Sequence, residues 1–343
     1  MVKLSRKNYF AEKIVFVDGL PGCGKTLFSS IISAMDKVEL LSYSYDIEHI
    51  CQLFYLDKIQ LDAAITMISI QTDLKLYNTM MGRDVNFRPS DLSSALNYYN
   101  PSKYFNRLND VGDAAIPEKI IQEKPILNFS VHNMLAFSDP IWESLGERCV
   151  FIEVVRHPLY MVRQQVLNMQ NMIATARSFS VYFEKDSNEL IYYVKGWEDK
   201  YLQSNSFERV IYFMDNLTRK TQKARDKITL EFESNVLTIP FEQFVLDPDL
   251  WMDKIAEVIG TNITNETRKI MKEQNVPRDM VSQGVDLDVY RRCGWKSPEE
   301  NSTERDELNI RREEIAREIS SDALVVLDRL SKEYEDQYWK LDA

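Results

Sequence analysis

The feature that most constrains the fold of this chain is a glycine-rich segment near its start, GLPGCGKT, at residues 19–26. It fits the pattern G-x-x-x-x-G-K-T, and a short apolar run, KIVFV (13–17), leads into it. An amphipathic stretch, TLFSSIISAM (26–35), follows directly. A strand, a glycine turn and a helix in this order let backbone N–H groups and the positive end of the helix face one anion. The segment therefore predicts an α/β fold built around a phosphate-binding loop.

Within this loop the chemistry depends on two side chains. Lys25 brings a point charge toward terminal phosphate oxygens, and Thr26 is placed to contact a phosphate or a magnesium ion. The residues that we expect to surround the bound group are Gly19, Pro21, Gly22, Cys23, Gly24, Lys25, Thr26 and Leu27. The loop by itself predicts a phosphate ligand and leaves open which phosphate-bearing molecule it is.

Composition excludes several classes of function. The formal charge of the 343 residues is −11, and no dense stripe of Lys and Arg offsets it, which argues against a nucleic-acid partner. The four cysteines form no C-x-x-C pair and the three histidines lie far apart, so we expect reduced thiols and no metal site. The apolar runs have strand length, whereas a membrane span needs about 20 residues. We expect a cytoplasmic protein with no membrane span and no signal peptide.

The remaining pattern predicts a single domain over 1–343 with a three-layer α/β/α fold and a mainly parallel central sheet. Further strands are expected at 38–45, 124–131, 148–155, 209–215 and 235–241. Residues 60–115 read as a helical insertion that covers the acceptor site, and 300–343 as C-terminal helices. Polar clusters after two strands, at 130–133 and 156–158, should meet near the loop because ligands collect at the carboxyl ends of parallel strands.

A nucleotide triphosphatase or kinase needs an acidic residue to hold magnesium. Glu153 lies inside a predicted strand that ends in Arg-His-Pro, so it is poorly placed for this role. Asp46 and Glu48 follow another strand and are alternatives, although they suit a solvated turn or a helix start equally well. The sequence thus supports a triphosphate ligand through the loop, but not through a clearly placed magnesium ligand.

Several segments together resemble the sulfotransferase family, whose members transfer a sulfuryl group from 3′-phosphoadenosine 5′-phosphosulfate (PAPS) on a P-loop fold. The family's donor loop, G-x-P-[KR]-[ST]-G-T-T, aligns without a gap on residues 19–26. The family's basic residue falls on Gly22 and its first threonine on Lys25, so the positive charge is shifted by three positions. The segment CVFIEVVRHPLYMVRQQV (149–166) is similar to the family's strand, Arg-Asp-Pro and helix. The resemblance implies that Arg156 and Gln164 bind the donor's 3′-phosphate.

Two later segments extend this resemblance in the expected order. LTIPFEQFVLDPDLWMDKIAEVIG (237–260) is similar to a structural strand and helix of the family. YRRCGWK (290–296) resembles the segment that folds over the 3′-phosphate, which makes Arg291, Arg292 and Lys296 further candidates for binding the donor.

The catalytic base is expected at His132, ten residues before Trp142, as in cytosolic members of the family. An unperturbed imidazole titrates near neutrality, which suits proton removal. A carboxylate base is the alternative, because other branches of the family use His or Asn here for structure. His157, in place of the usual acid after the arginine, is expected to be structural.

The resemblance implies a transferase in which Lys25 stabilises the leaving phosphate and His132 deprotonates the acceptor. The donor would be PAPS, yielding 3′,5′-adenosine bisphosphate (PAP), and the acceptor a hydroxyl or amine of a small molecule or carbohydrate. The alternatives are a small-molecule kinase using ATP with Mg²⁺ and a nucleotide-binding protein without catalysis.

Overall fold

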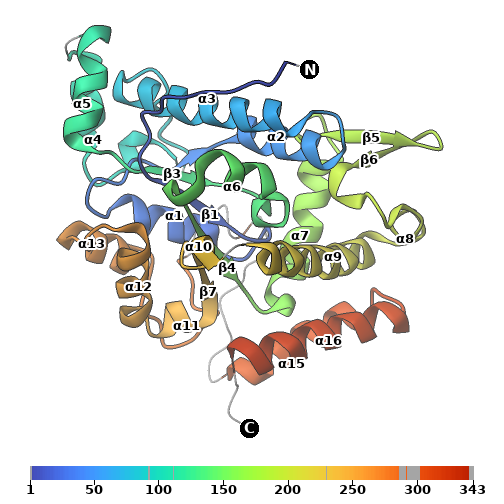
Figure 1. Cartoon of the computed structure of the whole chain (residues 1–343). Helices are drawn as coiled ribbons and strands as arrows, with labels where there is room; N and C mark the ends of the chain where they lie inside the picture. Colours follow the sequence, from blue (N-terminus) through green and yellow to red (C-terminus); the bar gives the residue numbers. More distant parts are fainter. Residues whose placement is uncertain are drawn as a thin grey trace.

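The computed structural model describes residues 2–91, 93–110, 112–228, 230–285, 291 and 302–339. Its main sheet has five strands in the order β2-β3-β1-β4-β7, and each neighbouring pair is parallel (Figure 1). The strands are β1 (Ile14–Asp18), β2 (Ser42–Tyr43), β3 (Leu127–Ser130), β4 (Cys149–Val155) and β7 (Val236–Pro240). A separate antiparallel hairpin consists of β5 (Tyr182–Lys185) and β6 (Asn188–Ile191). The expected mainly parallel central sheet is confirmed.

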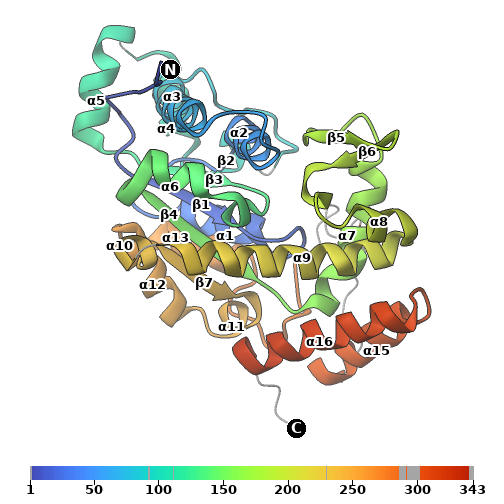
Figure 2. The ribbon, with the colours of Figure 1, turned by 45° about the vertical axis from the view of Figure 1, so that its right-hand side comes forward.

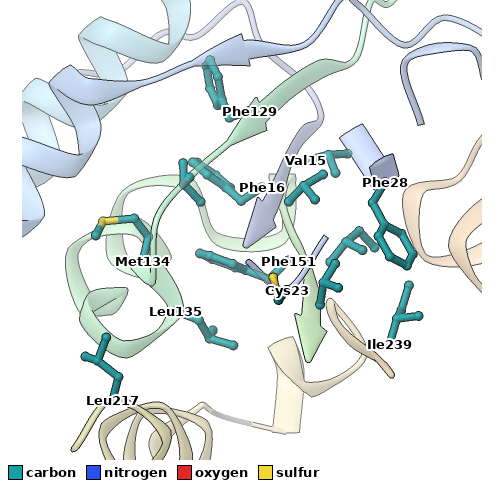
Figure 3. Packing of buried hydrophobic residues seen from close by; sticks show 14 of the residues in the cluster. Val15, Phe16, Cys23, Phe28, Phe129, Met134, Leu135, Phe151, Leu217 and Ile239 are labelled. Carbon is teal, nitrogen blue, oxygen red and sulfur yellow. The ribbon is translucent and has the colours of Figure 1, made fainter. Parts of the chain in front are cut away.

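The centre of the sheet is buried on both faces. Every residue of β1 and β3 is buried, as is typical of parallel strands that helices cover on both sides. Phe16 of β1 is in register with Phe129 of β3 and Phe151 of β4, and its ring lies 5.5 and 5.1 Å from theirs. Figure 3 shows this row of rings, with Cys23 of the loop packed beside Phe151. The core therefore holds the first strand and the loop that follows it in a fixed position.

Helices cover both faces of the sheet, which confirms the three-layer arrangement. On one face lie α1, α12 and α13, and on the other α6 and α9, with α3 outside α6 (Figures 1 and 2). The helices are α1 (Lys25–Ser33), α2 (Tyr45–Tyr55), α3 (Leu61–Met80), α4 (Pro101–Leu108), α5 (Ile116–Glu123), α6 (Asp139–Leu145), α7 (Pro158–Asn168), α8 (Glu198–Gln203), α9 (Ser206–Lys227), α10 (Leu230–Glu233), α11 (Phe241–Leu246), α12 (Asp249–Ile259), α13 (Asn265–Glu273), α15 (Glu304–Ala316) and α16 (Ser321–Tyr338).

Two expected strands differ from the structure. The strand expected over 38–45 is reduced to β2, with Val38 forming an isolated bridge to Ile126. The strand expected over 209–215 is wrong, because these residues belong to the 22-residue helix α9. Asn205 and Glu208 form a capping box at the start of that helix, and a run of buried residues at 210–214 gave the sequence its strand-like appearance.

The insertion and the tail are helical, as expected. Residues 60–115 contain α3 and α4, and the C-terminal helices α15 and α16 lie side by side against α7 and α9 (Figure 2). Two hydrogen bonds of 2.6 Å from Arg312 to Asp328 join α15 to α16. Among the described residues, no helix combines the length and the apolar character that crossing a membrane requires.

Candidate functional site

The predicted phosphate loop connects the end of β1 to the start of α1, and its backbone conformation requires glycine. Gly19 and Gly24 have φ angles of +141° and +106°. A Cβ atom would lie 2.3 Å from the carbonyl oxygen of Val154 at the first position and 2.4 Å from the ring of Phe241 at the second. The neighbouring strand β4 and the helix α11 therefore leave room only for a bare backbone at these two positions.

Lys25 is held inside the curve of this loop. Its ammonium donates hydrogen bonds of 2.7 Å to the carbonyl of Gly19 and 3.2 Å to that of Leu20, and its side chain is buried. Asp18, just before the loop, accepts hydrogen bonds from the backbone N–H groups of Met134 and Leu135. Burial raises the pKa of Asp18. This carboxylate fixes the loop to the segment that follows β3.

A cavity of about 370 Å³ opens in front of the loop, and its wall is strongly positive. Of the described residues that line it, Glu48 is the sole carboxylate. The basic side chains in the wall are Lys25, Arg156, Arg163, Arg177, Arg278 and Arg311. Because the chain as a whole carries a formal charge of −11, this concentration of positive charge marks a site for an anionic ligand.

Arg156 lies at the carboxyl end of β4 and touches the loop, as the sequence resemblance implies. Its Nη1 donates a 3.0 Å hydrogen bond to the carbonyl of Gly22, and its guanidinium lies 4.2 Å from the centre of the Phe241 ring. Desolvation in this wall lowers the pKa of Arg156. Gln164 of α7 packs beside Gly22, where an added Cβ would lie 3.1 Å from its amide oxygen. Both predicted donor contacts are therefore next to the loop.

Two further arginines join Arg156, and the sequence did not single them out. Arg278 lies 5.6 Å from the centre of the Phe241 ring. Arg311 of α15 lies 4.8 Å from that of Tyr160, whose ring also contacts Arg156 at 5.1 Å. Three guanidinium groups thus gather around two aromatic rings at one flank of the loop. We call Arg156, Arg278 and Arg311 the arginine cluster.

The other expected donor contacts have different outcomes. Pro21, Gly22, Gly24, Lys25, Thr26 and Leu27 line the main cavity. Gly19 and Cys23 instead line a smaller cavity of about 160 Å³ behind the loop, and burial raises the pKa of the Cys23 thiol. Arg291 is exposed. Arg292 and Lys296 lie outside the described residues.

His132 lines the main cavity just beyond the end of β3, and Glu48 of α2 holds it. The Oε1 atom of Glu48 lies 3.0 Å from Nδ1 of His132 and also accepts a 3.1 Å hydrogen bond from the backbone N–H of the same residue. The carboxylate side chain is 5% exposed, and the imidazole is 36% exposed. This arrangement assigns the proton to Nδ1 and leaves Nε2 to accept a proton, as a general base requires.

One of the remaining acidic candidates is engaged elsewhere. Glu153 forms an ion pair with Arg225 and accepts a 2.9 Å hydrogen bond from Thr238. Among the residues that the structure describes, no three His, Cys, Asp or Glu side chains are grouped as metal ligands.

His157 is fully buried. Its Nδ1 accepts a hydrogen bond from the N–H of Leu159, and its Nε2 lies 3.2 Å from the carboxylate of Glu335. These contacts give His157 the structural role that the sequence indicated.

The predicted cover of the acceptor site differs from the structure. None of the described residues in 60–115 lines the main cavity. The wall around His132 is formed instead by α2 and by the segment from Asn168 to Tyr193.

Neither a protein-family model nor a curated protein matches the chain. Among solved structures, it is similar to the sulfotransferase domain of the curacin biosynthetic pathway, with 10% identity and a TM-score of 0.45 over 93% of this chain and 97% of that one. The sulfotransferase domain of the Synechococcus PCC 7002 olefin synthase gives 11% identity and a TM-score of 0.45 over 100% and 98% of the two chains. A Mycobacterium tuberculosis H37Rv sulfotransferase gives 12% identity and a TM-score of 0.39 over 76% of this chain and 71% of that one. TM-scores below 0.5 leave the function to be argued from the site itself.

Proposed function

We propose that the protein is a sulfotransferase that uses PAPS as its donor. The observation that carries this proposal is the presence of two anion-binding groups in one cavity, the loop with Lys25 and the arginine cluster, beside a histidine with the orientation of a base. PAPS carries phosphates at two separate positions of its ribose, whereas the phosphates of ATP form a single chain. Two anion sites fit the first ligand better than the second.

In the proposed reaction the acceptor oxygen attacks the sulfur of the donor. The new O–S bond forms as the bond from sulfur to the 5′-phosphate oxygen breaks, and the electron pair of that bond remains on PAP. The loop N–H groups and Lys25 stabilise the charge that develops on this leaving phosphate. The arginine cluster and Gln164 hold the 3′-phosphate. Nε2 of His132 takes the acceptor proton, and the Glu48 carboxylate stabilises the imidazolium that results.

The choice of donor is tested by thermal unfolding with PAP, with AMP and with ATP–Mg²⁺. PAP at one hundred times its Kd should stabilise the protein by about 2.7 kcal/mol, and AMP should do less because it lacks the 3′-phosphate. Arg156→Ala should weaken the effect of PAP more than that of AMP. Stabilisation by ATP–Mg²⁺ alone would make the small-molecule kinase the better assignment. Binding of PAP without any transfer from PAPS would favour a nucleotide-binding protein.

The acceptor and the location are proposed on chemical grounds. A small-molecule or carbohydrate acceptor fits a cavity of about 370 Å³. Three of the cysteines, Cys23, Cys51 and Cys149, are buried free thiols, which fits a cytoplasmic protein.

A further inference from the structure

The wall around His132 presents a broad aromatic surface to the cavity. The rings of Tyr43 and Tyr45 are nearly parallel to the imidazole, at 12° and 14°, with centres 6.4 and 6.2 Å from it. The two tyrosines are 6.2 Å from each other. Three nearly parallel rings at equal separations cannot form a single stack, so they spread over a surface wider than one ring. Tyr43 and Tyr45 are 39% and 38% exposed, which leaves this surface open to a ligand.

The connection between α7 and β5 completes this wall. The backbone N–H of Val181 donates a 2.9 Å hydrogen bond to Gln52 of α2, and the carbonyl of Phe179 is hydrogen bonded to His49 of the same helix. Phe179 is 61% exposed, and its ring meets Tyr45 edge-on at 6.0 Å. These contacts hold residues 177–180 against the cavity. We call Tyr43, Tyr45 and Phe179 the aromatic wall.

Arg177 adds a positive charge to this side of the cavity. It lines the cavity two residues before Phe179, and it forms no ion pair with any residue that the structure describes. Glu48, the sole carboxylate among the described lining residues, is already bonded to His132. The donor's phosphates are assigned to the loop and to the arginine cluster. The charge of Arg177 is therefore left to interact with the acceptor.

We infer that the acceptor is an anionic phenol or a similarly flat aromatic alcohol. Its ring lies on the aromatic wall, its hydroxyl meets Nε2 of His132, and its anionic group pairs with Arg177. A protonated amine is disfavoured as an acceptor because the wall is positive and Glu48, its sole carboxylate among the described residues, is bonded to His132. This inference rests on the proposed sulfotransferase function and specifies the acceptor for the same site.

Three phenols with the same reacting group test the inference: 4-hydroxyphenylacetate, which is anionic, 4-ethylphenol, which is neutral, and tyramine, which is cationic. With PAPS as donor, kcat/KM should be about tenfold higher for the anion than for the neutral phenol, and lowest for the cation. Arg177→Gln should lower kcat/KM for 4-hydroxyphenylacetate to about the value for 4-ethylphenol in the same variant, which abolishes the advantage of the anion. Arg177→Glu should reverse the order in favour of tyramine.

The matched control is Lys185→Gln, which removes an exposed charge eight residues after Arg177 that is paired with Glu198 outside the cavity. It should leave the order of kcat/KM for the three phenols unchanged.

Thermal shifts with PAP test the sulfotransferase function separately from the identity of the acceptor. If PAP binds and all three phenols react equally, the anionic acceptor is overturned and the sulfotransferase function stands. If PAP binds but no phenol reacts or binds in its presence, the aromatic acceptor is overturned. If PAP fails to bind, both proposals fall.

Discussion

Glu48 shows how one side chain determines what its neighbour can do. A single oxygen of its buried carboxylate receives both the backbone N–H and the ring of His132. The imidazole is thereby fixed in position and in tautomer, with Nε2 available toward the cavity. In the sequence Glu48 was one of two candidates for a magnesium ligand. The structure makes it a positioning residue for the proposed base.

Glu48→Gln should lower kcat by about 10²-fold, because the amide holds the ring less well and does not stabilise the imidazolium. The KM for PAPS should stay the same, since Glu48 makes no contact with the phosphate loop. Steady-state kinetics that vary donor and acceptor separately measure this split.

Asp46→Asn is the matched control for that change, because it removes an exposed carboxylate from the same turn of α2. It should leave both kcat and KM near those of the unchanged protein. Equal losses in the two variants, or a loss confined to KM, would contradict the role of Glu48.

At the scale of elements, the buried carboxylate of Glu39 is one of the groups that attach α4 to the rest of the fold. Glu39 accepts hydrogen bonds of 2.8 and 2.9 Å from Arg107 and one of 3.0 Å from Tyr104, and Lys103 lies 3.0 Å away. Burial alone would raise the pKa of Glu39, but the two cations outweigh it and lower that pKa to about 2. The insertion is thus held by charge through residues that do not line the main cavity.

The stability that Glu39 contributes depends on pH. Because its pKa in the folded protein is below the ordinary value, the contribution is complete above pH 4.5 and is lost as the pH falls toward 2. Glu39→Gln should therefore reduce the free energy of unfolding by about 3 kcal/mol at neutral pH. The difference between the two proteins should shrink by more than half at about pH 3. Urea unfolding at several pH values measures it.

Glu12→Gln provides the comparison, since the ion pair of Glu12 with Lys124 is exposed on both sides. It should change the free energy of unfolding little at any pH, as surface pairs contribute little. A constant difference between Glu39→Gln and the unchanged protein from neutral pH to about pH 3 would show that the carboxylate is not the cause.

At the scale of the whole molecule, local features were predictable and distant partners were not. The strand, the loop and α1 are adjacent in sequence, so their pattern predicted this strand–loop–helix unit directly. The apolar runs of β3, β4 and β7 were recognised for the same reason. The run at 209–215 was not, because a short buried helix segment has the same composition as a strand. Arg278 and Arg311 lie more than a hundred residues from Arg156, and nothing in their local sequence marks them as partners.

The tail brings Arg311 to the cavity through contacts along its whole length. Glu304 at the start of α15 is hydrogen bonded to Tyr160 at 2.5 Å, and Glu335 of α16 lies 3.2 Å from His157. Tyr334 donates a hydrogen bond to Glu242, whose other oxygen accepts one from the N–H of His157. These contacts fix α15 and α16 to α7 and α11, beside the arginine cluster. A donor phosphate in that cluster would therefore contact both Arg311 of the tail and Arg156 at the end of β4.

Arg311→Ala should weaken PAP binding by about tenfold, because it removes a charge-assisted contact to the 3′-phosphate. Its affinity for AMP should fall less, since AMP has no phosphate at that position. Arg317→Ala, at the exposed end of the same helix and outside the cavity wall, removes the same charge and should change neither affinity. Calorimetric titration of both variants with both nucleotides gives the four dissociation constants.

Equal losses of affinity for PAP and for AMP in Arg311→Ala would mean that the tail supports the loop and does not bind the 3′-phosphate. No loss at all would remove Arg311 from the donor site.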